Sequence, residues 1–410
     1  MIQTISISNF KSFGDGALPP LAPFSVFIGP NAAGKSNLVD AFRFVQDCLR
    51  EGIGSAVTKR YGWANLRCRR RYSTTVSFRF SGAPADDELK LKAGDKPLEF
   101  SHLCFEYSFS FLYQGNDYTI TSELARLSAC PLLDEENQTA KQREISAFER
   151  TTSKVHLKEA LEAKKIHEQE LDVVEVNRSN LFISATFSSL AGLVTDREIG
   201  RWRFYDPDPR LARIPTLAQS VMAVSETGDT LALVLHQLRR GKHDGNGLHQ
   251  KFLDIVQEMV PGFEDWDTEQ LADGRIAFKV RERGLRGALP SLLVSDGTVR
   301  LLTILSALFG SQVPPSTIFI EEPERSLHPA VMEQLADLMR EVSSQTQIIV
   351  TTHSPDFVRH CRPGEVYLLD KVEGCTQAVQ AGSIEEIDQY LKHFTLDQLW
   401  LQGHLELGIP

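Results

Sequence analysis

The chain has 410 residues, a hydrophobic content of 42%, a charged content of 24% and a formal net charge of -10. These values are ordinary for a globular protein of two to three structural units, and the acidic balance argues against a protein whose whole surface binds nucleic acid. The chain contains no apolar run long enough to cross a membrane, no signal-peptide pattern and no CxxC pair among its six cysteines. We therefore expect a cytoplasmic protein with reduced thiols and no membrane partner.

The first 50 residues predict a strand, a glycine-rich loop and a helix. Residues 2–8 alternate between apolar and polar side chains, as a half-buried strand does. A buried strand at 24–28 leads into GPNAAGKS at 29–36, after which the apolar spacing is helical. This order places a G-x4-G-K-[ST] phosphate loop between a strand and a helix, which is the context that the motif requires.

The phosphate loop predicts a site for ATP and Mg²⁺. Gly29 and Gly34 permit a tight turn and a close approach of the backbone, and backbone N–H groups at the helix N-terminus face the anion. Lys35 would reach the β- and γ-phosphates, and the Ser36 hydroxyl would bind Mg²⁺. We also expect three more residues of this segment to line the nucleotide, namely Asn31, Ala33 and Asn37.

An arginine-rich run follows at residues 59–72. Its arginines at 67 and 69–71 are a candidate contact for nucleic acid or for a protein partner, and a solvated loop or edge is the alternative. The residues concerned are Arg67, Arg69, Arg70 and Arg71.

The middle of the chain changes character. Residues 74–80, 104–112 and 117–121 predict antiparallel strands, whereas residues 136–172 are rich in Lys, Glu and Gln. In that second stretch Leu157, Ala160 and Leu161 follow helical spacing, and Ser153 would serve as an N-cap. We therefore expect an N-terminal lobe at 1–130, a mostly helical insertion or arm at 131–215 and a C-terminal lobe at 216–410.

The C-terminal lobe predicts alternating helices and strands. Helices are expected within 228–260 and at 298–309 and 330–342, and strands at 274–283, 316–320 and 347–351. The strand at 316–320 ends in Glu321 and Glu322, at the edge where α/β sheets bind ligands. Glu321 would hold Mg²⁺ directly or through its water, and Glu322 would act as the general base on the attacking water. A capping box or a salt-bridge cluster is the alternative, and Glu324 is assigned no chemistry.

Two further features would complete a nucleotide site. His353 follows the strand at 347–351, where it could hydrogen-bond a γ-phosphate, although a lone histidine is usually structural. The segment Ser295, Asp296, Gly297 and Thr298 opens a helix. That segment is either an ordinary N-cap or a second anion site formed by a hydroxyl, a backbone N–H and a helix dipole.

These motifs, in this order, resemble the ABC-type ATPases of the RecF and structural-maintenance-of-chromosomes (SMC) class. ISNFKSFGD at 7–15, GPNAAGKSNLVDAFRF at 29–44, SDGTVRLL at 295–302, IFIEEPERSLHP at 318–329 and TTHSP at 351–355 carry the resemblance. Ala32 stands where the family more often has Gly, and Glu321 where it more often has Asp. Arg67 lies where the family carries its R-loop arginine. The chain is most similar to stand-alone predicted ATPases related to the OLD nucleases of bacterial defence.

The resemblance implies an ABC-ATPase head: an α/β fold with a mixed or parallel sheet, an antiparallel β subdomain and a helical insertion. It implies a homodimer or higher even oligomer in which two protomers sandwich ATP, Ser295 and Gly297 of one protomer completing the site of the other. Only 57 residues follow His353, which leaves no room for the Toprim nuclease of OLD proteins. A nuclease or toxin would therefore be a separate effector subunit.

Three functions compete. The first is an ATPase switch for a DNA-directed process in defence or genome maintenance, and the second is a scaffold or sensor that binds ATP and protein but no DNA. The third, the nucleotide-binding subunit of a transporter, is disfavoured by the SDGT signature. Because Glu321 reaches one methylene further than Asp, we also expect slow turnover.

Overall fold

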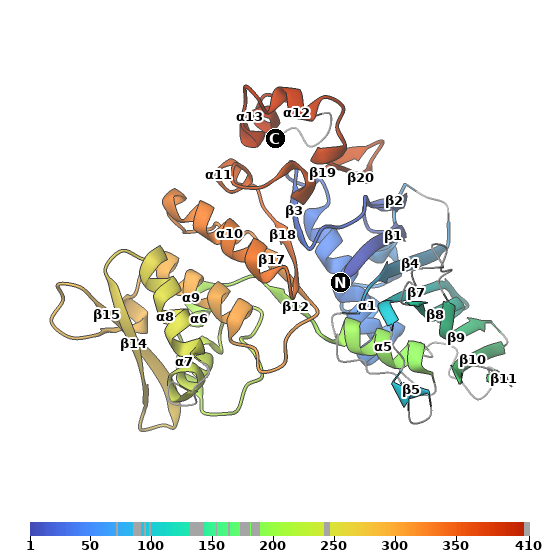
Figure 1. Ribbon diagram of the computed structural model, residues 1–410, viewed down its shortest axis with the longest axis horizontal. Helices are drawn as coiled ribbons and strands as arrows, with labels where there is room; N and C mark the ends of the chain where they lie inside the picture. The colour runs from blue at the N-terminus through green and yellow to red at the C-terminus, as the bar shows by residue number, and fades with distance from the viewer. Residues whose placement is uncertain are drawn as a thin grey trace.

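The computed structural model describes residues 1–70, 73–84, 92–93, 96–97, 100–131, 143–152, 154–162, 165–172, 181, 189–241 and 247–405. Within these ranges the strands form four sheets: one of eight strands, one of six, one of four and one of two, β5 (Lys92–Ala93) with β6 (Lys96–Pro97). The six-stranded sheet runs between a lobe of mostly antiparallel strands and a mainly helical lobe (Figure 1).

The six-stranded sheet positions the ends of the strands that carry the motifs. Its order is β12 (Trp202–Tyr205), β17 (Thr317–Glu321), β18 (Gln347–Thr351), β3 (Phe24–Ile28), β19 (Val366–Val372) and β20 (Cys375–Gln380). The first five strands run parallel and β20 is antiparallel. Strands β3, β17 and β18 are almost wholly buried and mainly apolar, because both of their faces are covered.

Each face of this sheet contributes to a separate core. On β17, Ile318 and Ile320 belong to the core formed with α7 (Leu231–Arg240), α8 (Leu248–Met259), α9 (Asp296–Phe309) and α10 (Met332–Val342). Phe319 points the other way, into the core shared with α1 (Lys35–Glu51) and the eight-stranded sheet. This alternation follows the two-residue period of a strand.

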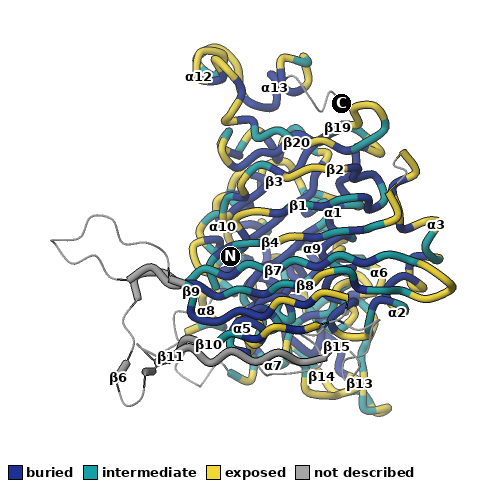
Figure 2. The backbone as a smooth tube through the Cα atoms, turned by 90° about the vertical axis from the view of Figure 1, so that its right-hand side faces the viewer, coloured by how far each residue is buried: buried dark blue, intermediate teal, exposed yellow. Residues whose placement is uncertain are grey.

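The eight-stranded sheet is antiparallel and packs on α1, with α5 (Leu190–Gly200) against three of its central strands. Its strands lie side by side across the molecule (Figure 2). In order they are β11 (Lys165–Asp172), β10 (Lys154–Glu162), β9 (Arg143–Thr151), β8 (Asp117–Pro131), β7 (Phe100–Gln114), β4 (Thr75–Gly82), β1 (Ile2–Phe10) and β2 (Phe13–Ala17). The three antiparallel strands predicted from 74 to 121 are confirmed and extended.

The prediction of a mostly helical insertion at 131–215 is wrong for the described part of that range. Residues 143–172 continue the antiparallel sheet as β9, β10 and β11. Val155 and Leu157 are buried while Lys154 and His156 are exposed, which is the period of a strand. Residues 202–205 form β12 of the six-stranded sheet, so the stretch is part of the ATPase body. Ser153 lies outside the described residues.

The C-terminal lobe follows the predicted order of elements. Helices α7, α8, α9 and α10 and strands β15 (Arg275–Glu282), β17 and β18 fall where they were expected. Strands β13 (Thr216–Leu217), β14 (Phe263–Gln270) and β16 (Leu289–Pro290) complete the four-stranded sheet with β15. The short helices are α2 (Ile53–Thr58), α3 (Trp63–Leu66), α6 (Pro209–Ala212), α11 (Pro355–Val358), α12 (Ile387–Tyr390) and α13 (Leu396–Leu401). Within the described residues, no helix has the length and apolarity that a membrane crossing needs.

Candidate nucleotide site

The phosphate loop joins the end of β3 to the start of α1 through residues with unusual backbone angles. Gly29 has φ +150° and Gly34 has φ +116°. A Cβ at Gly29 would lie 2.2 Å from the carbonyl oxygen of Leu369, so only glycine fits there. Ala32 has φ +66°, a left-handed angle that is uncommon for a residue with a side chain. The loop thus keeps the phosphate-loop shape without the glycine that would reduce its strain.

Lys35 is folded back into this loop. Its Nζ atom donates to the carbonyl oxygens of Gly29 at 2.5 Å and Pro30 at 3.0 Å, and only 7% of the residue is exposed. Burial lowers the pKa of Lys35 to about 8, and the negative charge of Glu322 partly offsets that shift. A buried ammonium group whose acceptors are uncharged carbonyls is poised to gain an anionic partner. Asn31 and Ser36 are exposed, and Ala33 is buried behind the loop.

A polar cluster holds the phosphate loop from behind. The Thr376 hydroxyl, on β20, lies 2.8 Å from the carbonyl oxygen of Ala33 and 2.7 Å from the Ser12 hydroxyl. The Asn37 side chain donates to the same Ser12 oxygen at 2.8 Å. Sequence spacing did not identify Ser12 or Thr376, because 364 positions separate them and only the fold brings them together.

Glu321 ends β17, two strands from the strand that carries the phosphate loop. Its Oε1 atom lies 3.4 Å from Nη2 of Arg43, and burial raises the pKa of Glu321. The exposed Ser36 hydroxyl and the Glu321 carboxylate are hard oxygen donors, the kind that Mg²⁺ prefers. A half-buried carboxylate whose ion pair within the described part of the chain is this long one fits the role of a Mg²⁺ ligand.

Glu322 adopts a left-handed backbone with φ +47° immediately after the strand. Its amide donates to the carbonyl oxygen of Thr351 at 2.8 Å, and its Oε2 lies 2.5 Å from Nε of Arg325. Arg300, a buried residue of α9, donates to the carbonyl oxygen of Glu322 at 2.7 Å. Strained residues of this kind persist where the surroundings fix them, often at functional sites. Arg300 was not identified from the sequence, where it resembles any polar position on a helix.

Glu324 ties the carboxylate loop to the histidine loop. Its Oε1 accepts hydrogen bonds from the Thr352 hydroxyl at 2.7 Å and from the His353 amide at 3.3 Å. Burial raises the pKa of Glu324. His353 is exposed, and burial followed by the charge of Lys35 lowers the pKa of its ring. Lys35 and Glu322 are near enough to His353 for their charges to affect the pKa of its ring, and the phosphate-sensing role of His353 stays a prediction.

The segment 295–298 opens α9 as an N-cap. The Ser295 hydroxyl is exposed and accepts from the Thr298 amide at 3.1 Å. Asp296 forms an ion pair with Arg213 at 2.6 Å. A Cβ at Gly297 would lie 2.5 Å from the carbonyl oxygen of Ser326, so this glycine lets α9 approach the loop that follows the carboxylates.

A basic pocket of about 610 Å³ borders the phosphate loop. It is lined by cations from three segments, and no carboxylate is among the described residues that line it: Lys11, Ser12, Asn37, Asn65, Arg67, Cys68, Arg69, Arg70, Lys371 and Gly374. The structure therefore brings three of the four predicted arginines to a pocket next to the P-loop helix. Arg71 lies outside the described residues.

Comparison with known proteins places this geometry in a family. The family described as "AAA domain, putative AbiEii toxin, Type IV TA system" matches residues 24–359. An ATP/GTP phosphatase of Helicobacter pylori is 21% identical over 368 residues, which cover 87% of this chain and 86% of that protein.

Chromosome-maintenance proteins match shorter stretches. SMC protein 1 of Schizosaccharomyces pombe is 29% identical over 168 residues (40% of this chain, 13% of that protein), and RecN of Rickettsia conorii is 31% identical over 120 residues (28% and 22%). The matched regions span less than a quarter of the SMC and RecN proteins. An SMC head solved with the C-winged helix domain of ScpA aligns with a TM-score of 0.53 at 14% identity, covering 92% of this chain and 97% of that one. The fold is thus that of an ABC-ATPase head.

Proposed function

Because the chain belongs to the AAA-domain family described as a putative AbiEii toxin of type IV toxin–antitoxin systems, and is an SMC- and RecF-like ATPase, we propose that it is an ATP-driven switch. In this proposal ATP·Mg²⁺ binds between the phosphate loop and Glu321. Two protomers close around the nucleotide, and hydrolysis reopens them. The switch acts on a nucleic-acid-directed process in defence or genome maintenance through a separate effector subunit.

The observation that carries the proposal is the position of Lys35. Its ammonium group is buried in the phosphate loop, and its hydrogen-bond acceptors among the described residues are the carbonyl oxygens of Gly29 and Pro30 in that loop. A triphosphate entering the loop would offer this cation anionic oxygens in exchange, which raises its pKa and releases the cost of burying an unpaired charge. Mg²⁺, held by Ser36 and Glu321, would neutralise the charge on the phosphates.

Glu322 is the proposed base for hydrolysis. A carboxylate within reach of the attacking water can accept its proton, and Glu322 follows β17 directly, with a left-handed backbone. The present ion pair with Arg325, which is mostly exposed, would have to break first. Glu321 in place of the commoner Asp supports slow turnover, as suits a switch. A turnover rate for Glu321→Asp that does not exceed the parental rate would refute that reading.

Dimerisation is tested with the Glu322→Gln variant. With ATP and Mg²⁺ this variant should accumulate as a dimer in light scattering, because the nucleotide that joins the protomers is not hydrolysed. The matched control adds Lys35→Ala, which should leave the protein monomeric under the same conditions. A Glu322→Gln variant that stays monomeric with saturating ATP would contradict the sandwich. The exposure of Ser295 at the start of α9 supports this arrangement.

The basic pocket supports a contact with the phosphate backbone of DNA. Replacing Arg67, Arg69 and Arg70 with Gln should weaken DNA binding and reduce its dependence on salt, because each lost phosphate contact releases one fewer counterion. The affinity for ATP is the control. If the three substitutions weaken ATP binding and leave DNA binding unchanged, the pocket serves the nucleotide, and the scaffold or sensor function without DNA is favoured. Co-purification from the native host would identify the effector.

A further inference from the structure

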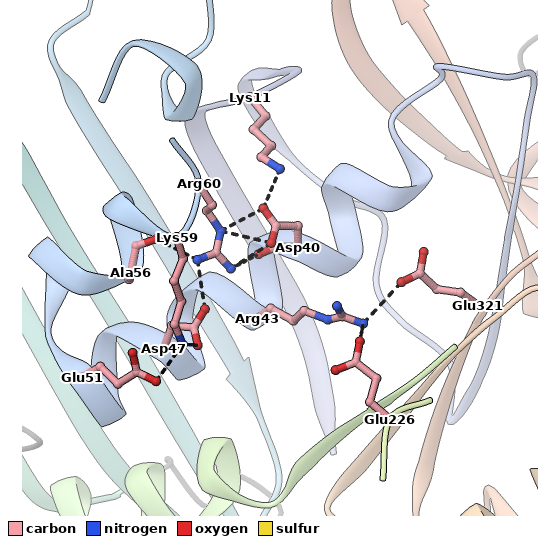
Figure 3. A network of polar contacts seen from close by, with 10 residues as sticks. All are labelled: Lys11, Asp40, Arg43, Asp47, Glu51, Ala56, Lys59, Arg60, Glu226 and Glu321. Atoms are coloured by element: carbon pink, nitrogen blue, oxygen red, sulfur yellow. Dashed lines mark hydrogen bonds and ion pairs between the residues drawn. The ribbon is translucent and has the colours of Figure 1, made fainter. Parts of the chain in front are cut away.

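Arg43 lies on the P-loop helix and faces two carboxylates at once. Ser36 and Arg43 are seven residues apart on α1, so they share one face of the helix at a separation of about 10 Å along its axis. The same nitrogen of Arg43, Nη2, lies 2.5 Å from Oε1 of Glu226 and 3.4 Å from Oε1 of Glu321 (Figure 3). The guanidinium group also lies over the ring of Phe204, 5.1 Å from its centre.

Glu226 is held in place by the lobe that carries α9. Its carbonyl oxygen accepts from the Asp206 amide at 3.0 Å, directly after β12, which pairs with β17. Two residues later the chain passes so close to α9 that a Cβ at Gly228 would lie 2.8 Å from Cγ2 of Thr303. The position of Glu226 is therefore fixed relative to both β17 and α9.

We propose that Arg43 and Glu226 set the Mg²⁺ requirement of the nucleotide site. Arg43 competes with the metal for the Glu321 carboxylate, and Glu226 draws Arg43 away from that carboxylate. The shorter of the two ion pairs, to Glu226, leaves Glu321 available. This inference rests on the proposed function, because it takes Glu321 as the metal-binding carboxylate. Arg43 and Glu226 are positioning residues, since both act through Glu321.

The competition predicts opposite effects for two substitutions. Arg43→Gln removes the competitor and should raise the apparent affinity for Mg²⁺ roughly fivefold, the size expected of a partly exposed ion pair. Glu226→Gln leaves Arg43 with Glu321 as its remaining partner and should lower that affinity by a similar factor. A merely structural role would weaken the site in both variants, so the difference in sign distinguishes the two explanations.

The double variant distinguishes a direct Arg43–Glu226 ion pair from two charges that act independently on the metal site. If Glu226 acts by holding Arg43, removing Glu226 has no further effect once Arg43 is gone, and the double variant behaves like Arg43→Gln alone. If the two charges act only through space, their effects add, and the double variant returns to the parental affinity. That additive outcome would overturn the proposal.

The measurement is ATP binding as a function of free Mg²⁺, by calorimetry, with every substitution placed in the Glu322→Gln background so that no hydrolysis intervenes. Arg50→Gln is the matched control. It removes an arginine from the same helix, where Arg50 donates to the carbonyl oxygen of Gly200, and should leave the Mg²⁺ dependence unchanged. If ATP binding in the starting background is independent of Mg²⁺, the proposed function fails. If it depends on Mg²⁺ but neither substitution shifts it, only the present inference fails.

A second readout requires no metal. In EDTA, urea unfolding of the parent, the two single variants and the double variant should give a non-additive cycle, because Arg43 and Glu226 form their ion pair directly with each other. Additive changes in the midpoint would show that the two residues do not interact, and would overturn the proposal whatever the Mg²⁺ titrations give.

Discussion

Thr376→Val is the substitution that most directly tests how the phosphate loop is held. Thr376 is 8% exposed, and its hydroxyl bonds the carbonyl oxygen of Ala33 at 2.8 Å and the Ser12 hydroxyl at 2.7 Å. Valine keeps the shape but places a methyl group where the hydroxyl was, closer to the Ala33 oxygen than the roughly 3.3 Å at which carbon and oxygen normally meet. The loop must shift or leave a buried carbonyl without its donor.

The expected cost follows from that geometry. A buried acceptor left unsatisfied costs about 1–3 kcal/mol, so the free energy of unfolding should fall by about 2 kcal/mol. If the nucleotide-free loop relaxes to recover half of this, the Kd for ATP rises about fivefold, since 1.4 kcal/mol corresponds to a factor of about ten. Urea unfolding and calorimetric ATP binding measure the two quantities. Thr376→Ser retains the hydroxyl and is the control. Unchanged stability and Kd in Thr376→Val would refute the reasoning.

Three further predictions follow from the same structure. The affinity for ATP should fall as the pH rises through about 8, because Lys35 loses its proton there. Between pH 8 and 10.5, the ordinary pKa of lysine, the free energy of unfolding of the protein without ATP should rise, because the unfolded chain then binds more protons than the folded one. A pH series of the Kd for ATP and of the unfolding free energy checks both. Gly297→Ala should reduce ATP turnover at least tenfold while each protomer still binds ATP, because the alanine Cβ would lie 2.5 Å from the Ser326 carbonyl oxygen. Steady-state kinetics measures the turnover, and a separate ATP titration measures the binding. Asp40→Asn should lower the free energy of unfolding by about 2 kcal/mol in urea, because it removes one of the two carboxylates paired with the buried Arg60 guanidinium, at 2.8 Å, and leaves Asp47 as the other.

The motifs with fixed spacing could be predicted because each lies within one strand–loop–helix unit. The phosphate loop at 29–36 and the carboxylates after 316–320 need only local sequence, since apolar runs fix the strands and the following residues must then lie at their carboxyl ends. The contacts among those units could not be predicted. Thr376 on β20 reaches Ser12 between β1 and β2, and Arg43 on α1 reaches Glu226 in a loop, only because the fold packs together elements that are distant in sequence.

The middle of the chain is where the spacing of apolar residues gave a wrong prediction, a helix in place of strands. Leu157, Ala160 and Leu161 match a helix over little more than one turn, but Val155 and Leu157 also match a strand, and both are buried in β10. A short amphipathic match cannot separate the two periods when the neighbouring strands are unknown. Pairing with β9 on one side and β11 on the other decides the outcome.

Phosphate release from ATP by the purified protein, by Glu322→Gln and by Glu324→Gln tests the central claim most directly. The account predicts that Glu322→Gln lowers the rate by about 10²–10⁴-fold, the share that a general base contributes, while ATP binding is kept. Glu324→Gln should retain most of the rate, because its amide oxygen can still accept the hydrogen bonds from Thr352 and His353. A Glu322→Gln variant that hydrolyses ATP at the parental rate would contradict the account.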